Sequence, residues 1–288
     1  MQSRITLLKC GRFLSTSAAS PRVTVDMVGA DKNIAAVTLN RPEKLNALDM
    51  NMFRAVRDVA EDLADDKKIR AVILSGSGKG FCAGLDVKSV ASSPVSSVGE
   101  LLRKPGASEH SCLAQDVGYS WRKLRVPVIA ALHGVCFGGG LQIALGADIR
   151  IASPACKLSV MEAKWGLIPD MSLTVTLRDL VRIDVAKELT MTGRVFEGDE
   201  ALRMGVVTKL ADDPYEEALK LAEQIVGRSP DSVACAKELL QRTWHASEQE
   251  CLEVETELQK QLLASWNQLA ASARAFGASF VPYKARSS

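Results

Sequence analysis

Residues 133–150 read HGVCFGGGLQIALGADIR, and residues 81–87 read FCAGLDV. In the first stretch, three consecutive glycines at 138–140 stand directly before the apolar run 141–145, which favours a helix. Glycine lets another molecule approach the backbone closely, and a helix start offers unpaired N–H groups and partial positive charge. If the two stretches converge, their N–H groups can stabilise negative charge developing on one oxygen. Together they predict an oxyanion hole, whereas either stretch alone indicates only a turn.

The hydrophobic pattern around these stretches predicts a layered α/β fold. Alternating segments 22–27 and 33–39 predict a β-hairpin, and Asp49 is the expected N-cap of an amphipathic helix ending near Ala64. Three apolar runs are expected to form buried strands: 71–74, 128–132 and 149–152. Strands that alternate with helices predict right-handed crossovers between layers.

The remaining segments carry weaker signals. Residues 89–107 are rich in Ser, Pro and Gly and predict an exposed excursion. A helix is expected from Asp213 with Pro214 at its first position, and residues 229–230 are expected to separate two helices. A long periodic segment, 247–274, is expected to close the chain.

Composition excludes several classes of function. The 288 residues carry a net charge of +2, with 47% hydrophobic and 24% charged residues, which indicates a protein with a sizeable core and no polyanionic partner such as a nucleic acid. No run approaches eighteen apolar residues, so no membrane span is expected. Seven cysteines without a CxxC pair indicate free thiols in a reducing compartment and no metal site, and Cys82 and Cys136 are expected to serve packing.

Residues 1–20 differ from the rest of the chain. They carry Arg4, Lys9 and Arg12 and many hydroxyl groups, and the first acidic residue is Asp26. This composition predicts a mitochondrial transit peptide and a matrix location, with an inconsequential tail and a cytoplasmic location as the alternatives.

Five motifs, in this order and spacing, resemble the crotonase (enoyl-CoA hydratase/isomerase) superfamily. They are TLNRPEKLNAL (38–48), AVILSGSGKGFCAGLDV (71–87), PVIAALHGVCFGGGLQIALGADIRIA (127–152), KLSVMEAKWGLIPDMSLTV (157–175) and AKELTMTGRVFEGDEALRMGVV (186–207). The resemblance implies a ClpP-like α/β spiral of ββα units as a core domain at 21–228. It also implies a C-terminal helical region at 229–288 that supports a trimer or hexamer.

The resemblance further implies which residues bind and act on an acyl-CoA. The oxyanion donors would be the backbone N–H groups of Leu85 and Gly139, and the proton-transferring carboxylates would be Glu162 and Asp170. Contacts with substrate and coenzyme A would come from Lys44, Leu45, Ala47, Ala83, Gly84, Leu85, Asp86, Val87, Gly139, Gly140 and Gln142. No separate cofactor is expected, because coenzyme A enters as part of the substrate.

The carboxylates indicate which reaction to expect. The hydratase pattern has a glutamate where this chain has Gln142, and an amide cannot exchange a proton at neutral pH. Asp170, eight residues after Glu162, matches the dienoyl-CoA isomerase branch instead, although that branch has an acid at the position of Gln142. The alternatives are a helix N-cap for Asp170 and a surface ion pair for Glu162.

An enoyl- or dienoyl-CoA isomerase of fatty-acid β-oxidation is therefore expected, with a hydratase as the main alternative and a thioester hydrolase as a weaker one. A silent scaffold and an RNA-binding protein are disfavoured by the retained carboxylates and the near-neutral charge. A phosphate-binding P-loop fails because Ile73 stands where its first glycine belongs and Gly80 follows Lys79. No G-x-S-x-G motif supports a serine hydrolase.

Overall fold

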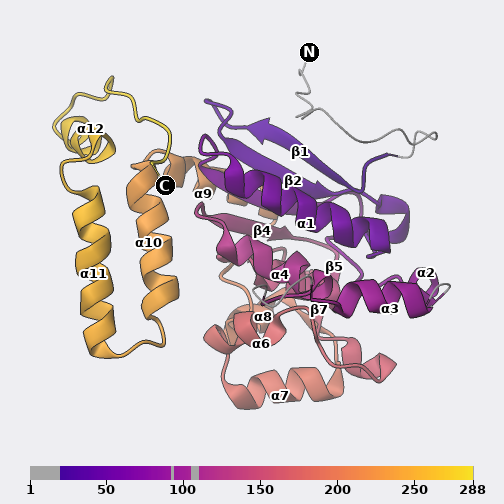
Figure 1. The fold of residues 1–288 in the computed structure, drawn as a ribbon. Helices are drawn as coiled ribbons and strands as arrows, with labels where there is room; N and C mark the ends of the chain where they lie inside the picture. The colour runs from indigo at the N-terminus through magenta and orange to yellow at the C-terminus, as the bar shows by residue number, and fades with distance from the viewer. Residues whose placement is uncertain (1–19, 92–93, 105–109, 288) are drawn as a thin grey trace.

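The computed structural model describes residues 20–91, 94–104 and 110–287 (Figure 1). The predicted transit peptide therefore lies, except for Ser20, outside the described residues. The strands are β1 Val23–Val28, β2 Ile34–Leu39, β3 Ala71–Gly76, β4 Val128–Leu132, β5 Val135–Phe137, β6 Ile149–Ala152, β7 Lys157–Ser159, β8 Phe196–Glu197 and β9 Lys209–Leu210.

Helices alternate with these strands in the first two thirds of the chain and follow one another at its end. The α-helices are α1 Met50–Asp65, α2 Val87–Ala91, α3 Pro94–Leu102, α4 Leu113–Lys123, α5 Gly139–Leu145, α6 Leu173–Thr176, α7 Ile183–Thr192, α8 Gly198–Met204, α9 Pro214–Val226, α10 Pro230–Thr243, α11 Glu248–Leu262 and α12 Trp266–Ala275. Three short 3-10 helices are η1 Pro42–Lys44, η2 Glu162–Trp165 and η3 Leu177–Asp179.

Two sheets organise the strands. The larger sheet has six strands in the order β1-β2-β3-β4-β6-β9, in which β1 is antiparallel to β2 and every other pair is parallel. The smaller sheet has the order β5-β7-β8. The predicted hairpin is confirmed, with Val23 opposite Leu39 and Val28 opposite Ile34. The three predicted buried strands are confirmed as β3, β4 and β6.

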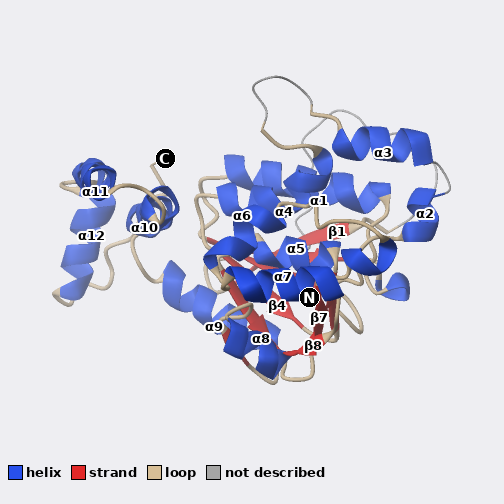
Figure 2. Cartoon of the chain, turned by 90° about the horizontal axis from the view of Figure 1, so that it is seen from below, coloured by secondary structure: helices blue, strands red, loops and turns tan. Residues whose placement is uncertain are grey.

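Both faces of the larger sheet are covered, which explains its apolar strands. On one face, isoleucines of four strands pack against Ala218 and Ala222 of α9: Ile34, Ile73, Ile129 and Ile151. Alternate residues, among them Val72 and Leu74, point to the opposite face and join the main core with α1, α4 and α5. Figure 2 shows the strands enclosed by helices.

Helix α1 begins and ends close to its predicted bounds. The side chain of Asp49 caps it by accepting a hydrogen bond from the N–H of Met52 at 2.8 Å. Its buried face consists of Met52, Phe53, Val56, Ala60 and Leu63. The cap and the apolar face both come from local sequence, which is why the pattern located this helix.

Two predicted segments differ from the structure. The excursion expected at 89–107 is wrong in part, because α2 and α3 occupy much of it, and Glu100 accepts two 2.7 Å hydrogen bonds from Arg54 of α1. The periodic segment 247–274 is two helices, because the chain breaks at Ala264, where φ is 61°, and Ser265 caps α12.

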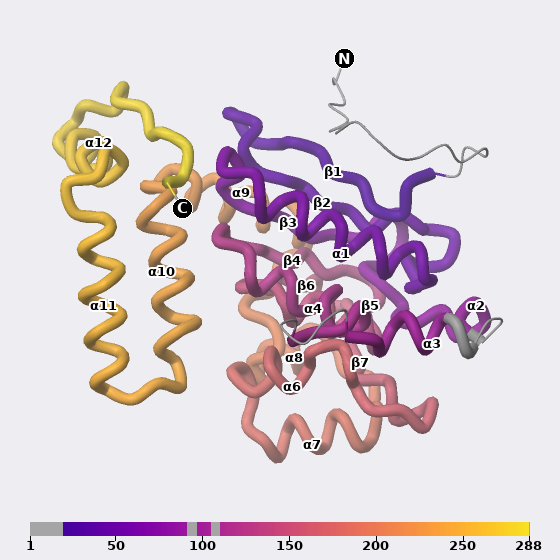
Figure 3. Tube along the Cα trace, viewed as in Figure 1, coloured from indigo at the N-terminus to yellow at the C-terminus, as the bar shows by residue number. Residues whose placement is uncertain are grey.

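Helices α10–α12 stand to one side of the sheets (Figures 1 and 3). They are tied to the sheets by the buried ammonium of Lys237, which donates to Asp148 at 2.7 Å and to the carbonyl of Val126 at 3.0 Å. The chain end returns to the same helices, since Ser287 donates to Asp231 through its N–H and its hydroxyl. Among the described residues, no helix combines the length and the apolar character needed to cross a membrane.

Candidate active site

The two glycine stretches lie against each other, as the sequence predicts. After β3, the N–H of Cys82 donates to the carbonyl of Val135, and the N–H of Phe137 donates to the carbonyl of Cys82. Gly84 has φ of 87°, and a Cβ on it would lie 2.7 Å from the Phe137 carbonyl oxygen and 3.6 Å from the Gly139 nitrogen. A side chain at Gly84 would thus be strained and would push the two loops apart.

The N–H groups of Leu85 and Gly139 are both available at this junction. Gly138 is the N-cap of α5, so Gly139 is the first residue of the helix and has no partner in the preceding turn. Among the described residues, neither N–H donates a hydrogen bond to a backbone or side-chain acceptor. Two free donors beside the start of a buried helix form a site suited to an oxyanion.

Glu162 lies beside the glycines of the second loop. It begins η2, and a Cβ on Gly138 would lie 3.3 Å from its Oε1 atom. Its Oε2 atom is buried and has no hydrogen-bond partner among the described residues. Burial, together with the charge of Asp170, raises the pKa of the Glu162 carboxyl, while the hydrogen bond from Gln142 opposes the rise. A desolvated carboxylate with one free oxygen is suited to act as a base.

Asp170 is close enough to Glu162 for its charge to act on that carboxyl. Partial desolvation raises the pKa of Asp170 as well, although the residue is exposed and so keeps a contact with solvent. The alternative interpretation as a helix cap is wrong. Helix α6 begins only at Leu173, and its N-cap is Ser172, whose φ is 72° and whose side chain makes no capping bond.

Gln142, on α5, contacts both Glu162 and the segment that contains Asp170. Its Nε2 group donates to Oε1 of Glu162 at 2.7 Å, and its Oε1 atom accepts from the N–H of Met171 at 2.8 Å. The residue is 1% exposed. Both ends of its amide are therefore bonded to the protein.

The segments predicted to hold coenzyme A are adjacent to the N–H groups of Leu85 and Gly139. The N–H of Ala83 donates to the carbonyl of Leu45 at 2.9 Å, and Arg41 donates both to the carbonyl of Ala47 at 3.0 Å and to Asp86 at 2.8 Å. Burial alone would raise the pKa of Asp86, but its hydrogen bond from Arg41 leaves that pKa below the ordinary value.

The other predicted contacts lie around the same junction. Lys44 ends η1 and is exposed, and Val87 begins α2. Gly140 is packed so closely that a Cβ on it would lie 2.6 Å from the carbonyl oxygen of Cys82. The predicted contacts therefore lie on η1, at the starts of α2 and α5 and in the segments beside them, and Lys44 is exposed.

Asn46 is the structural residue that sequence reasoning missed. It is buried at a φ of 57°, and its amide donates to the carbonyls of Ser77, Gly80 and Phe81. Its side-chain oxygen accepts from the N–H of Arg41 at 2.7 Å. Asn46 thus joins the loop that carries Lys44 and Leu45 to residues 77–81, which lead into the first glycine stretch. The sequence signal for this role is the tolerance of asparagine for the left-handed region.

The two cysteines near the site serve packing rather than nucleophilic chemistry. Cys82 and Cys136 are fully buried, and Cys82, in the loop after β3, forms an isolated parallel bridge with Cys136 of β5. Burial raises the pKa of Cys82 to about 12 and also raises that of Cys136, so both thiols stay protonated.

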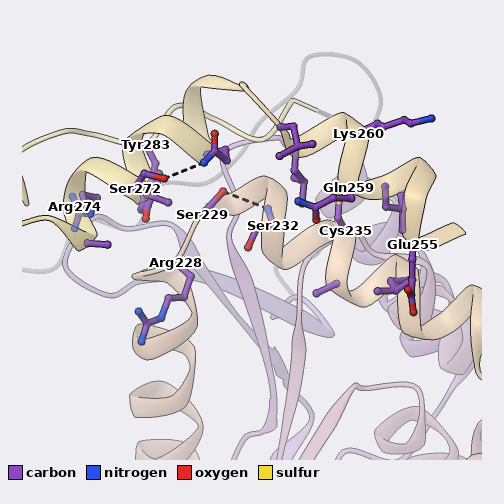
Figure 4. A pocket seen from close by; sticks show the side chains of 18 of the residues that line it. Arg228, Ser229, Ser232, Cys235, Glu255, Gln259, Lys260, Ser272, Arg274 and Tyr283 are labelled. Carbon is purple, nitrogen blue, oxygen red and sulfur yellow. Dashed lines mark hydrogen bonds between the residues drawn. The ribbon is translucent and has the colours of Figure 1, made fainter. Parts of the chain in front are cut away.

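A separate groove lies between α10, α11 and α12, with a volume of about 1320 Å³ (Figure 4). Its lining includes Arg228, Ser229, Glu255, Arg274 and Tyr283. None of the residues predicted to bind or act on substrate lines this groove. It is therefore distinct from the candidate active site.

Comparison with known proteins agrees with this geometry. The family model for enoyl-CoA hydratase/isomerase matches residues 29–276. A short-chain-enoyl-CoA hydratase of Clostridium acetobutylicum is 34% identical over 212 residues, 73% of this chain and 78% of its own. A peroxisomal Δ(3,5)-Δ(2,4)-dienoyl-CoA isomerase of Arabidopsis thaliana is 32% identical over 248 residues, 82% of this chain and 84% of its own.

Solved structures give the same answer for the fold. The crystal structure of an enoyl-CoA hydratase from Bacillus anthracis superimposes with a TM-score of 0.80 at 27% identity, covering 91% of this chain and 99% of that one. The chain has the crotonase fold and belongs to the enoyl-CoA hydratase/isomerase family. Members of this family are enzymes whose substrates are acyl-CoA thioesters, and the geometry of the candidate site fits such a substrate.

Proposed function

We propose that this protein is an enoyl-CoA isomerase that shifts a double bond along an acyl-CoA chain, in fatty-acid β-oxidation. The observation that carries the proposal is the bond from the neutral amide of Gln142 to Glu162, in a site where the second charge that acts on Glu162 is that of Asp170. Hydration needs one group to deprotonate water and another to supply a proton at the next carbon. A carboxylate that is hydrogen-bonded to an amide is less suited to hold that water than a pair of carboxylates.

The reaction of a 3-enoyl thioester can be followed atom by atom. Glu162 removes a proton from C2, and the electron pair moves to the thioester oxygen, which accepts hydrogen bonds from the N–H groups of Leu85 and Gly139. Return of a proton at C4 gives the 2-enoyl thioester. No water enters or leaves, so the product is an isomer of the substrate.

A 3,5-dienoyl thioester places a different demand on the site, because the proton must return at C6. Asp170 is the group proposed to supply it. Desolvation raises the pKa of Asp170, which is the direction that a proton donor needs, and the exposure of this residue lets it regain a proton from solvent. Glu162 then releases to solvent the proton that it took from C2, which returns both carboxyl groups to their starting protonation states.

The substitution Asp170→Asn tests whether Glu162 removes the proton and Asp170 supplies the one that returns at C6. We expect it to lower turnover of a 3,5-dienoyl-CoA by at least about a hundredfold, because a general acid contributes a factor of this order. The 3-enoyl to 2-enoyl shift should fall by less than about tenfold, because Glu162 can serve both carbons. Ultraviolet absorbance of the conjugated product follows both reactions. If the variant keeps full activity on both substrates, the proposed role of Asp170 is wrong.

A hydratase is the second candidate, favoured by the name and 34% identity of the Clostridium acetobutylicum relative. It predicts a 3-hydroxyacyl-CoA as the main product from a 2-enoyl-CoA.

We also propose that the enzyme acts in the mitochondrial matrix as a trimer or hexamer. The basic, hydroxyl-rich residues 1–20 support the location, and large exposed apolar side chains on the C-terminal helices support self-association: Leu240, Trp244, Leu252, Leu269 and Phe276. Imaging of a fluorescent protein fused behind residues 1–30 tests the location, which a cytoplasmic signal would contradict. Light scattering tests the assembly, which the mass of a monomer would contradict.

A further inference from the structure

The amide of Gln142 has only one orientation that satisfies its surroundings. The backbone N–H of Met171 needs an acceptor, so the Oε1 atom of Gln142 faces it at 2.8 Å. The Nε2 group then faces Oε1 of Glu162 at 2.7 Å and donates to it. Gln142 is 1% exposed and both ends of its amide are bonded. Rotation of the amide toward solvent or substrate would therefore break a hydrogen bond inside the protein.

This arrangement distinguishes the two oxygens of Glu162. Oε1 is held by the amide, whereas Oε2 is buried and has no hydrogen-bond partner among the described residues. A buried oxygen without a partner is costly and calls for an explanation. Removal of a proton from substrate by that oxygen provides one.

The acceptor end of the amide acts on the second carboxylate. Met171 directly follows Asp170, so the bond to its N–H fixes the backbone next to that carboxyl. The side chain of Met171 also lies against the second glycine loop, since a Cβ on Gly139 would lie 2.7 Å from its sulfur. One amide therefore links the base, the segment bearing Asp170 and the helix start that carries an oxyanion donor.

We propose that Gln142 is a positioning residue: its donor end orients Glu162, its acceptor end anchors the segment of Asp170, and together they set the spacing of the two carboxylates. This inference rests on the proposed function for its catalytic meaning, but its structural content can be measured in the unliganded protein. It assigns Gln142 a different role from a direct substrate contact.

The charged surroundings of Glu162 determine how the proposal is tested. Asp170, on the segment after η2, is the charged group that acts on Glu162, whereas α5 contributes only the neutral Gln142. Loss of the amide donor should therefore raise the pKa of Glu162 further, since a bond that favours the charged form is removed. A purely structural substitution elsewhere would leave that pKa unchanged.

Two neutral substitutions test the amide without adding a charge beside Glu162, which would raise its pKa by itself. Gln142→Met keeps the side-chain length but removes the donor and the acceptor, and Gln142→Asn keeps an amide that is one methylene too short to reach both partners. Thr176→Val is the matched control, because among the described residues this buried hydroxyl bonds only to the carbonyls of Ser172 and Leu173. If Gln142→Met fails to fold because the N–H of Met171 is left buried, Gln142→Asn still offers that N–H an acceptor and gives the answer.

The first measurement is a carbon-13 NMR titration of glutamate carboxyls, with the Glu162 signal assigned by its loss in Glu162→Gln. We expect a higher pKa of Glu162 in both Gln142 variants and no change in Thr176→Val. The second is the pH profile of kcat/KM with a 3,5-dienoyl-CoA. Its acid limb should move to higher pH, and kcat should fall about a hundredfold, as for a misplacement of reacting groups by about 1 Å.

The outcomes separate this inference from the proposed function. An unchanged Glu162 pKa in the folded neutral variants of Gln142 would overturn the positioning role, whatever reaction the enzyme catalyses. If the pKa rises in these variants while the wild-type enzyme turns over no dienoyl- or 3-enoyl-CoA, the positioning role is supported and the proposed function is contradicted. Binding of octanoyl-CoA, a saturated probe, should stay within about threefold in Gln142→Asn, and loss of binding would instead assign Gln142 to substrate contact.

Discussion

At the scale of single residues, the candidate site combines a desolvated carboxyl with N–H donors that have no partner among the described residues. Burial of Glu162 raises the pKa of its carboxyl, and the N–H groups of Leu85 and Gly139 are unpaired among the described residues. Both features are costly for stability, because a buried charge and unpaired donors lose their bonds to water. Such costs are typical of sites whose missing partner is a ligand.

The proposed oxyanion hole gives the first prediction. Gly139→Val should lower kcat with an enoyl-CoA at least about a hundred- to a thousandfold, since the branched side chain displaces the N–H donor and obstructs the site, and removal of one donor alone has an effect of this order. A Cβ at this position meets the flexible ends of Met171 at 2.7 Å and of Leu48 at 2.9 Å, so the fold should adjust while the site is obstructed. Circular dichroism checks folding, and a folded variant with near-native turnover would refute the assignment.

The raised pKa of Glu162 gives the second prediction, which concerns stability. Because the pKa in the folded protein lies above the ordinary value of 4.5, ionisation of Glu162 costs stability once the pH exceeds 4.5, and the full cost is reached above the raised pKa. Glu162→Gln should therefore unfold at a higher temperature than wild type at pH 8. The difference should shrink as the pH falls toward 4.5.

Thermal unfolding at several pH values checks this, with Glu255→Gln on the exposed surface as the control. A pH-independent difference would show that desolvation of the carboxyl is not its cause.

At the residue scale, the resemblance to the crotonase superfamily predicted Glu162, Asp170 and the glycines as site residues, but no pattern predicted their hydrogen-bond partners. The resemblance also indicated that Gln142 replaces an acid, yet its bond to Met171 joins positions 29 residues apart and has no local signal. Asn46 was missed for the same reason, since the carbonyls to which its amide donates lie 31 to 35 residues away.

At the scale of elements, local sequence signals predicted several of the helices and strands that carry or support the candidate site. Asp49 and the apolar periodicity gave α1, and Asp213 with Pro214 gave the start of α9. The helices within 89–107 were missed because their Ser, Pro and Gly content resembles a loop. Helix α3 instead depends on distant partners, such as the ion pair of Glu100 with Arg54.

The cap of α1 gives the third prediction. Asp49→Ala should lower the free energy of unfolding by about 1–2 kcal/mol, the effect of losing a good N-cap. The variant also loses the ion pair with Arg22 at 2.7 Å, so the upper end of this range is expected. Urea denaturation measures the change, and Asp58→Ala, an exposed residue of the same helix, is the control. Equal stabilities of the two variants would contradict the capping role.

At the scale of the whole molecule, the order of five motifs was enough to predict the fold. The motif order could not predict the placement of α10–α12. Their attachment depends on single contacts between distant residues, such as Lys237 with Asp148, 89 residues apart. The predicted division at residue 228 stays a prediction. The candidate site residues lie outside these helices, on α5, on η2 and in the segments around Leu85 and Asp170.

The most direct measurement of the central claim is product analysis of the wild-type enzyme in water enriched in oxygen-18. The pure protein is incubated separately with 2-enoyl-, 3-enoyl- and 3,5-dienoyl-CoA, and the masses of the resulting thioesters are measured by mass spectrometry. An isomerase should convert the 3-enoyl and 3,5-dienoyl substrates to products of unchanged mass without incorporating the label. Formation of labelled 3-hydroxyacyl-CoA from the 2-enoyl substrate, as fast as any isomer forms, would contradict the account.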